Sequence, residues 1–216
     1  MLENYKKHVA ERAEQNIPPL PLDADQTSEL IKLLKKDHKE SDFLLDLLKE
    51  RVPAGVDQAA YVKAAFLADI TTGKASSPYI TKIDAVKILG TMLGGYNIQP
   101  LIECLKDNEL AEAAAHVLSR TLLIFDAFNE IFELSKTNEH AKKVVEEWAN
   151  ATWFTEKTDI EEQIKLTVYK VTGEINTDDL SPAPDAWSRP DIPLHALAMF
   201  KMPRTGLDDP LGTIEK

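Results

Sequence analysis

The chain has 216 residues, of which 44% are hydrophobic and 28% charged, a composition typical of a soluble globular protein with a sizeable core. Acidic residues outnumber basic ones in residues 1–158 (25 to 19) and again in residues 159–216 (11 to 6), and the net charge is −11. No part is basic enough to predict a nucleic-acid-binding face. No apolar run approaches the length of a membrane span, and no hydrophobic signal region opens the chain, so we expect a cytoplasmic protein.

Residues 1–150 show the apolar spacing of amphipathic helices, separated by short polar or proline-containing connections. The predicted helices cover residues 4–15, 28–36, 41–52, 57–73, 85–93, 97–107, 108–123, 125–136 and 138–150. Roughly nine helices with short connections predict antiparallel neighbours stacked as pairs, in an α-helical solenoid or an irregular bundle.

Local signals within these segments predict individual contacts. Ser41 is a candidate N-cap, and Thr81 with Asp84 forms a variant of the capping box. The core-facing residues expected of two helices are Tyr61, Ala65, Phe66 and Ile70 in the first, and Ala141, Val144, Val145 and Trp148 in the second. Gly94 and Gly95 follow a helix and precede no Lys-Ser or Lys-Thr pair, so they predict a tight turn and not a phosphate loop.

Four lysines cluster in IKLLKKDHKE, at positions 32, 35, 36 and 39. They alternate with Leu33 and Leu34 and are most simply the solvated side of an amphipathic helix. This interpretation leaves the chain without a basic surface for nucleic acid.

The only cysteine of the sequence is Cys104. One cysteine excludes an internal disulfide, and it cannot supply the several thiolates of an all-cysteine metal or cluster site. His8, His38, His116 and His140 lie on different predicted helices, without a second His or Cys at ligand spacing. We therefore expect no metal site, a partly buried packing role for His116, and a small apolar role for Cys104.

The pattern changes near residue 158. Ile164, Leu166 and Val168 alternate with polar or amphipathic residues in QIKLTVYKVTG, which predicts a half-buried strand. A helix opened by Pro193 is expected to follow. Because a single strand cannot satisfy its own backbone groups, we expect C-terminal sequence beyond this chain to complete the sheet.

Between that strand and that helix lies a proline-rich acidic loop. Asp178 and Asp179 either belong to a ligand site or accept backbone N–H bonds in an Asx-type turn, and both interpretations stay open. For Asn176, Thr177 and Ser181 the turn is the leading interpretation. Arg189 is, by composition alone, a solvated or salt-bridged loop residue. Pro190 restricts it to an extended conformation.

These residues resemble a known family. VTGEINTDDLSPAPDAWSRPDIPLHALAM closely resembles the entry into the swivel domain of the bacterial aconitase B class, and NTDDLSP is related to the TDxIxP element of other aconitases. YKKHVAERA, FLLDLLKERVPAGVDQAAYVKAAFLA and LGTMLGGYNIQPLI are similar to the N-terminal HEAT-like helical domain of that class. The resemblance covers nearly all of residues 1–200 and is weakest from Met202 onward.

The resemblance implies a mainly α fold: a HEAT-like helical domain over residues 1–158, followed over residues 159–216 by the first strand and helix of an incomplete α/β swivel domain. Members of the class are hydro-lyases of the tricarboxylic acid cycle. They interconvert citrate and isocitrate through cis-aconitate, and many also hydrate 2-methyl-cis-aconitate. They use a 4Fe-4S cluster, whose cysteine ligands would lie outside this chain, so we expect the chain alone to be inactive.

The resemblance assigns Arg189 to substrate binding, because a tricarboxylate needs guanidinium groups that bind carboxylates pairwise. It places Asp178 and Asp179 in a candidate active-site loop, and it assigns no catalytic or metal-binding residue to the chain. Implied partners are the tricarboxylate, the remaining catalytic domains and a second copy bound through the helical domain. The alternative is a non-catalytic helical module for dimerisation or regulatory RNA binding, which the acidic charge does not favour.

Overall fold

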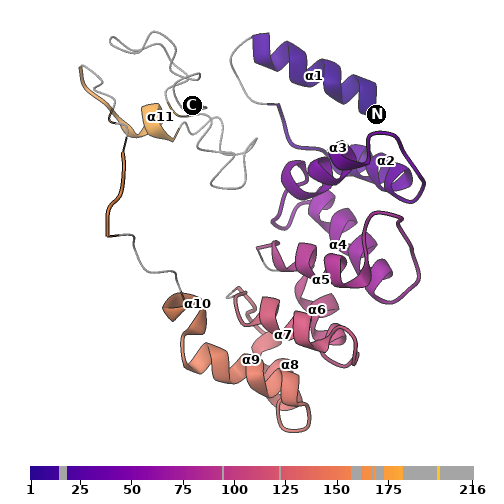
Figure 1. The fold of residues 1–216 in the computed structure, drawn as a ribbon, viewed down its shortest axis with the longest axis vertical. Helices are drawn as coiled ribbons and strands as arrows, with labels where there is room; N and C mark the ends of the chain where they lie inside the picture. Colours follow the sequence, from indigo (N-terminus) through magenta and orange to yellow (C-terminus); the bar gives the residue numbers. More distant parts are fainter. Residues whose placement is uncertain are drawn as a thin grey trace. The chain divides into compact units, whose positions relative to one another are not determined.

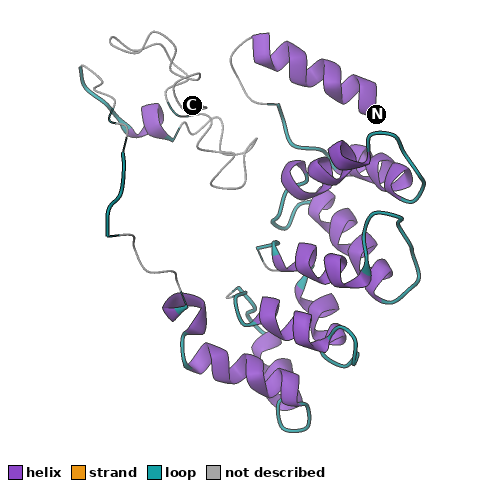
Figure 2. Cartoon of the chain, in the orientation of Figure 1, coloured by secondary structure: helices purple, strands orange, loops and turns teal. Residues whose placement is uncertain are grey.

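A computed structural model describes residues 1–14, 19–93, 95–121, 123–156, 162–166, 168, 173–181 and 199. The chain divides into two compact units, one of Met1–Pro21 with Asp159–Lys216 and the other of Leu22–Thr158. Within the described ranges all regular elements are helices (Figure 2). The predicted mainly α-helical fold is confirmed at this level, whereas the HEAT-like assignment stays a prediction.

The unit Leu22–Thr158 contains most of the described helices. They are α2 (Ala24–Leu34), α3 (Ser41–Asp46), the π-helical turn η1 (Leu47–Arg51), α4 (Gln58–Thr71), α5 (Lys82–Gly90), α6 (Ile98–Cys104), α7 (Ala111–Leu118), α8 (Ala127–Leu134), α9 (Glu139–Ala149) and α10 (Thr152–Thr155). Each helix predicted over this range is present, although most are shorter than expected because their last turns become hydrogen-bonded turns.

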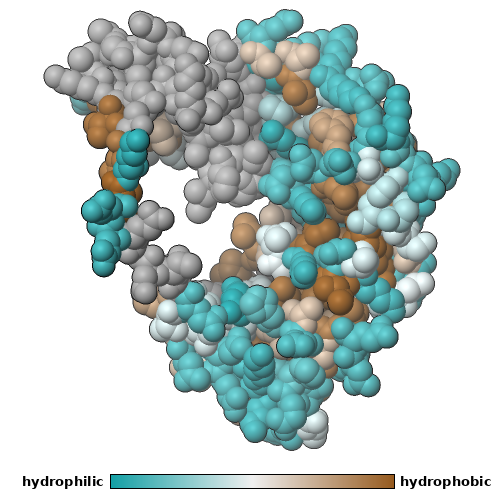
Figure 3. Space-filling model, viewed as in Figure 1, coloured by the Kyte–Doolittle hydropathy of each residue, from teal (hydrophilic) through white to brown (hydrophobic). Residues whose placement is uncertain are grey.

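These helices pack against their neighbours in chain order (Figure 1). α2 contacts α4, α4 contacts α5, α5 contacts α7, and α7 contacts α9, while α6 lies against α5 and α7 and α8 lies against α9. In the space-filling view of Figure 3, hydrophobic residues are visible along this stack, surrounded by hydrophilic ones. The core is rich in leucine and alanine, and its fully buried leucines include Leu30, Leu34, Leu44, Leu48, Leu67, Leu89, Leu101 and Leu118.

Side-chain caps define where several helices begin. The capping box predicted for Thr81 and Asp84 is confirmed, since the Asp84 amide donates to Thr81 Oγ1 (3.1 Å) and the Thr81 amide to Asp84 Oδ2 (3.0 Å). The Thr81 hydroxyl also donates to Asp84 Oδ2 (2.6 Å), and this bond, with that of the Thr81 amide, holds the pKa of the Asp84 carboxyl below its usual value. The N-cap predicted at Ser41 is wrong: Ser41 is the first residue of α3, and Glu40 stands at the cap without a side-chain bond to the helix.

The buried face of α4 differs from the predicted one. Phe66 and Ile70 are buried as expected, but Ala65 is exposed and Tyr61 is 52% exposed, stacked edge to face on Tyr96. Lys63 takes a place in the core instead, with 1% of its surface exposed. α4 packs against α2, α5 and α6 together, so contacts from three sides decide its orientation.

The buried side chain of Lys63 contacts the π-helical turn η1. The Lys63 ammonium donates to the carbonyl of Lys49 at 3.4 Å, within η1. Burying an ammonium is costly unless it has polar partners, and the irregular turn offers a carbonyl that faces it. Sequence periodicity does not single out this residue, because a lysine on a helix is usually solvated.

The predictions for the buried face of α9, for His116 and for the Gly94–Gly95 turn differ in outcome. On α9, Ala141 and Val144 are fully buried, while Val145 and Trp148 are only half-buried. His116 is exposed, so its predicted packing role is wrong: it lies on the side of α7 away from the buried alanines. Gly95 has φ +87 and confirms a tight turn, whereas Gly94 lies outside the described residues.

The other unit contributes α1 (Leu2–Glu14) and α11 (Thr177–Leu180). On α1, Tyr5 is buried, and its hydroxyl donates to the Leu20 carbonyl at 2.9 Å. The Leu20 amide in turn donates to His8 Nε2 at 2.9 Å. These two bonds tie the segment after α1 back onto the helix.

The strand predicted around residues 164–168 is not confirmed. The described residues there, 162–166 and 168, form no strand, and Leu166 and Val168 are 74% and 85% exposed. A strand needs a neighbour to pair its amides and carbonyls, and no described residue offers one. The helix expected after Pro193 lies outside the described residues.

Replacing Gly90 by Ala should destabilise the stack, although this change normally stabilises a helix. A Cβ at Gly90 would lie 2.6 Å from both Cβ and Cγ1 of Val117, so α5 and α7 would have to separate. We expect the free energy of unfolding to fall by about 1–3 kcal/mol, measured by urea denaturation. Gly55→Ala, where the added Cβ meets nothing within 4 Å, is the matched control. Adding Val117→Ala should recover part of the loss, and a Gly90→Ala protein as stable as the parent would contradict this packing.

Candidate functional site

The acidic loop folds into a short capped turn. Asn176 is the N-cap of α11: the Asp179 amide donates to Asn176 Oδ1 (3.2 Å), and the Asn176 amide donates to Asp179 Oδ2 (2.9 Å). The turn predicted for Asn176 is therefore confirmed. Asp179 is the reciprocal partner of the cap, and only 7% of its surface is exposed.

The two aspartates of this turn differ in their surroundings. Asp178 is exposed, whereas Asp179 is buried and has one carboxylate oxygen engaged by the backbone. Both lie in the first turn of α11, where a negative charge is favourable. The cap and the favourable charge at the first turn of α11 account for the two aspartates in structural terms. Their expected place near a substrate stays a prediction.

Arg189, the residue expected to bind substrate, lies outside the described residues. Its role stays a prediction from the resemblance.

Cys104 lies on α6 and is 4% exposed. Burial raises the pKa of its thiol, the neighbouring charges of Asp107 and Glu103 raise it further, and a hydrogen bond with Thr71 acts in the opposite direction. A buried thiol with a raised pKa is a poor nucleophile and a poor metal ligand. In the described part of the chain, no group of three or more His, Cys, Asp or Glu residues is placed to hold a metal ion.

The lysine cluster lies on the solvent side of α2 and the turn after it. Lys32, Lys35, Lys36 and Lys39 are all exposed, while Leu30, Ile31 and Leu34 of the same helix are buried. Lys32 pairs with Glu29 at 2.5 Å, and Lys35 lies over the ring of Phe66. The predicted solvated face is confirmed.

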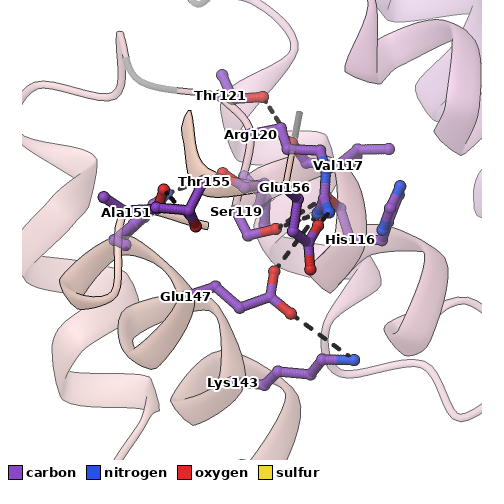
Figure 4. Close-up of polar contacts among 12 residues, drawn as sticks. His116, Val117, Ser119, Arg120, Thr121, Lys143, Glu147, Ala151, Thr155 and Glu156 are labelled. Atoms are coloured by element: carbon purple, nitrogen blue, oxygen red, sulfur yellow. Dashed lines mark hydrogen bonds and ion pairs between the residues drawn. The ribbon is translucent and has the colours of Figure 1, made fainter. Parts of the chain in front are cut away.

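A polar network that sequence analysis missed joins α7, α9 and α10 (Figure 4). Arg120 is at its centre, and its guanidinium donates to the His116 carbonyl, Ser119 Oγ, Glu147 and Glu156. No sequence signal identifies it, because its acidic partners are 27 and 36 residues away.

Two family models match the chain. The model for the "Aconitate B N-terminal domain" matches residues 4–154, and the model for the "Aconitate hydratase 2 N-terminus" matches residues 166–216. Both describe N-terminal parts of aconitate hydratases, so this is the class of protein to which the helical unit and the capped acidic turn belong. The second match runs through residue 216 and so extends beyond Met202, where the sequence resemblance is weakest.

Individual relatives are similar over almost the whole chain. The aconitate hydratase B of Escherichia coli K12 is 59% identical over 210 residues, which are 96% of this chain and 24% of the relative. The protein of the same name from Pseudomonas aeruginosa is 58% identical over the same shares, and that from Synechocystis is 56% identical over 99% of this chain and 25% of the relative. The chain belongs to the aconitate hydratase B family. It spans about a quarter of the length of these relatives.

None of the helices in the described ranges is both long enough and apolar enough to cross a membrane.

The native thiol of Cys104 should react slowly in thiol–disulfide exchange. Because it is buried and its pKa is raised, we expect its reaction with a disulfide reagent at pH 8 to be on the order of a hundredfold slower in the native protein than in urea. The control is the Cys104→Ala, Lys106→Cys variant, which moves the thiol to a neighbouring exposed position. Equal native rates for the two thiols would show that Cys104 is accessible.

Proposed function

We propose that this chain is the N-terminal part of an aconitate hydratase B, a hydro-lyase that interconverts citrate and isocitrate through cis-aconitate in the cytoplasm. The observation that carries the proposal is the family match over residues 4–154 and 166–216, together with 59% identity to the Escherichia coli protein. Hydration of 2-methyl-cis-aconitate is a second reaction that we propose for the same site.

In this proposal the chain contributes two domains. Residues 1–158 form a HEAT-like accessory domain, and residues 159–216 begin a swivel domain whose first strand pairs with strands from later sequence. The two family matches support a boundary here, because one ends at residue 154 and the other begins at residue 166. The exposure of Ile164, Leu166 and Val168 supports it too, since three apolar side chains on alternate positions favour a face that another element covers.

A 4Fe-4S cluster would supply Lewis-acid chemistry at the substrate's hydroxyl and carboxylate in the complete enzyme. The residues of this chain do not fit such a cluster, because the single cysteine is buried in the helical core and lacks a second thiol partner. We therefore propose that the cysteine ligands belong to other domains of the protein.

The contribution of this chain to the substrate site is Arg189. A guanidinium binds a carboxylate through two parallel hydrogen bonds, which suits a substrate with three carboxylates. A proline disfavours the helical conformation for the residue before it, so the Arg189–Pro190 sequence predicts an extended Arg189. We also propose that Asp178 or Asp179 orients an arginine or a water molecule at this site. Asp179 Oδ2 is occupied by the Asn176 amide, so Asp178 has the more accessible carboxylate.

The remaining catalytic domains are the partners this proposal requires. Dimerisation through the helical domain stays a weaker proposal. No described feature favours RNA binding, because the one lysine cluster is a solvated helix face that contains an ion pair.

The purified 216-residue chain should form no cluster and should not turn over cis-aconitate. After incubation with iron, sulfide and thiol under anaerobic conditions, we expect no cluster absorbance, because a cluster needs several thiolates and one is present. The complete protein treated in parallel is the control. Cluster absorbance or hydratase activity from the chain alone would overturn this division of roles.

In the complete enzyme, Arg189→Ala should lower kcat/KM for citrate and isocitrate roughly tenfold to several hundredfold, because each charge-assisted bond contributes about 1.5–3 kcal/mol. Arg189→Lys should recover only part, since lysine restores the charge and not the planar fork. Both are measured by the absorbance of cis-aconitate as it forms or disappears.

Lys165→Ala is the matched control, because it removes an exposed cation from the same part of the chain. It should leave kcat/KM unchanged, and all variants should retain the parent's thermal unfolding. Wild-type kinetics for Arg189→Ala would identify Arg189 as a surface residue. Loss of activity in Lys165→Ala as well would indicate a general electrostatic effect.

A further inference from the structure

The chain turns sharply where α9 ends. Ala151 follows α9 with φ +51, a left-handed conformation that a residue with a Cβ adopts only when its surroundings hold it there. The short helix α10 begins at the next residue, and the amides of Phe154 and Thr155 donate to the Ala151 carbonyl at 2.8 and 3.0 Å. Four residues of helix are too short to be stable alone. Something outside α10 must therefore hold this turn.

Arg120, just after α7, is the residue that reaches it (Figure 4). Its Nη1 donates to the His116 carbonyl at 3.1 Å and to Ser119 Oγ at 2.9 Å, so the guanidinium is first fixed to its own helix end. The same nitrogen lies 3.4 Å from Glu147 Oε2 on α9, and Nη2 donates to Glu156 Oε2 immediately after α10. One planar group thus connects three helices.

The surroundings of this group make it more than an ordinary surface ion pair. Exposed pairs contribute little, because water competes and two flexible side chains must be ordered. Here the guanidinium side chain is 33% exposed and that of Glu147 20%, and Lys143 lies 3.8 Å from the second oxygen of Glu147. Trp148 of α9 also donates its indole N–H to the Leu118 carbonyl at 3.1 Å, which anchors α9 to the same end of α7.

We propose that Arg120 is a latch: its contacts with Glu147 and Glu156 hold the turn between α9 and α10 against the end of α7. Glu156 is the residue after α10 that Arg120 binds. It lies between the end of the first family match at residue 154 and the start of the second at residue 166. The latch does not depend on the aconitase activity proposed above.

The test is amide hydrogen exchange in the 216-residue chain, followed by NMR at Phe154 and Thr155. Arg120→Ala should speed exchange at these two amides roughly three- to tenfold, while the amides of α2 to α6 keep their rates. Arg120→Lys should behave almost like the alanine variant, because one ammonium cannot replace the two guanidinium nitrogens that contact four partners.

Glu156→Ala is the second variant, because this side chain is 58% exposed and its loss cannot unfold the unit. It should speed the same two amides, and the Arg120→Ala, Glu156→Ala double variant should be no faster than Arg120→Ala. Lys106→Ala is the matched control, since it removes an exposed Lys–Glu pair just beyond α6 and should change neither amide. Parent-like rates in Glu156→Ala, or equal acceleration along all the helices in Arg120→Ala, would overturn the latch.

Discussion

The helical unit depends on close contact between helices, and small side chains at the helix interfaces allow it. The buried alanines lie on α4, α5, α7 and α9, which contact one another in that order: Ala59, Ala60, Ala64, Ala85, Ala111, Ala114, Ala115 and Ala141. Where α5 meets α7 even a methyl group has no room, as the contact between Gly90 and Val117 shows. Leucines fill the wider spaces between these contacts, so volume at the interfaces sets the spacing of the whole stack.

Short helices need hydrogen-bond partners at their ends, and in this chain later segments provide them. Ser77 Oγ donates to the Leu34 carbonyl at the end of α2, and Asn97 Nδ2 to the Leu89 carbonyl near the end of α5. In the same way Asn138 binds the Leu105 carbonyl after α6, and Trp148 binds the Leu118 carbonyl at the end of α7. Because helices of this length are marginal alone, these bonds and the apolar contacts make each helix depend on its neighbours.

The helical scaffold and the expected chemistry lie in different parts of the chain. In the described helices between residues 22 and 156, many titratable groups form solvated pairs, caps or the network around Arg120, while Lys63 and Cys104 are core side chains. The residues assigned to the substrate by resemblance all follow residue 176. Membership of the aconitate hydratase B family therefore carries the functional proposal.

The local sequence of the acidic turn was sufficient to predict part of the candidate site. Asn176 caps α11 through bonds to a residue three positions away, and such bonds depend only on neighbouring residues. The same holds for Thr81 and Asp84. The substrate-binding role proposed for Arg189 would require groups from other parts of the protein, and for that reason neither periodicity nor turn chemistry could predict it.

The sequence by itself determined the helical segments, the capped turns and the family, because apolar spacing, cap residues and motifs are local properties. Only the tertiary structure decided which side of α4 is buried, placing Lys63 in the core and Tyr61 at the surface. It also decided that Arg120 would join Glu147 and Glu156. The strand expected near Ile164 and Val168 also depends on tertiary structure, because a strand is stable only when a neighbouring strand pairs with it. Burial and pairing depend on what packs against a segment, and the segment's own residues do not contain that information.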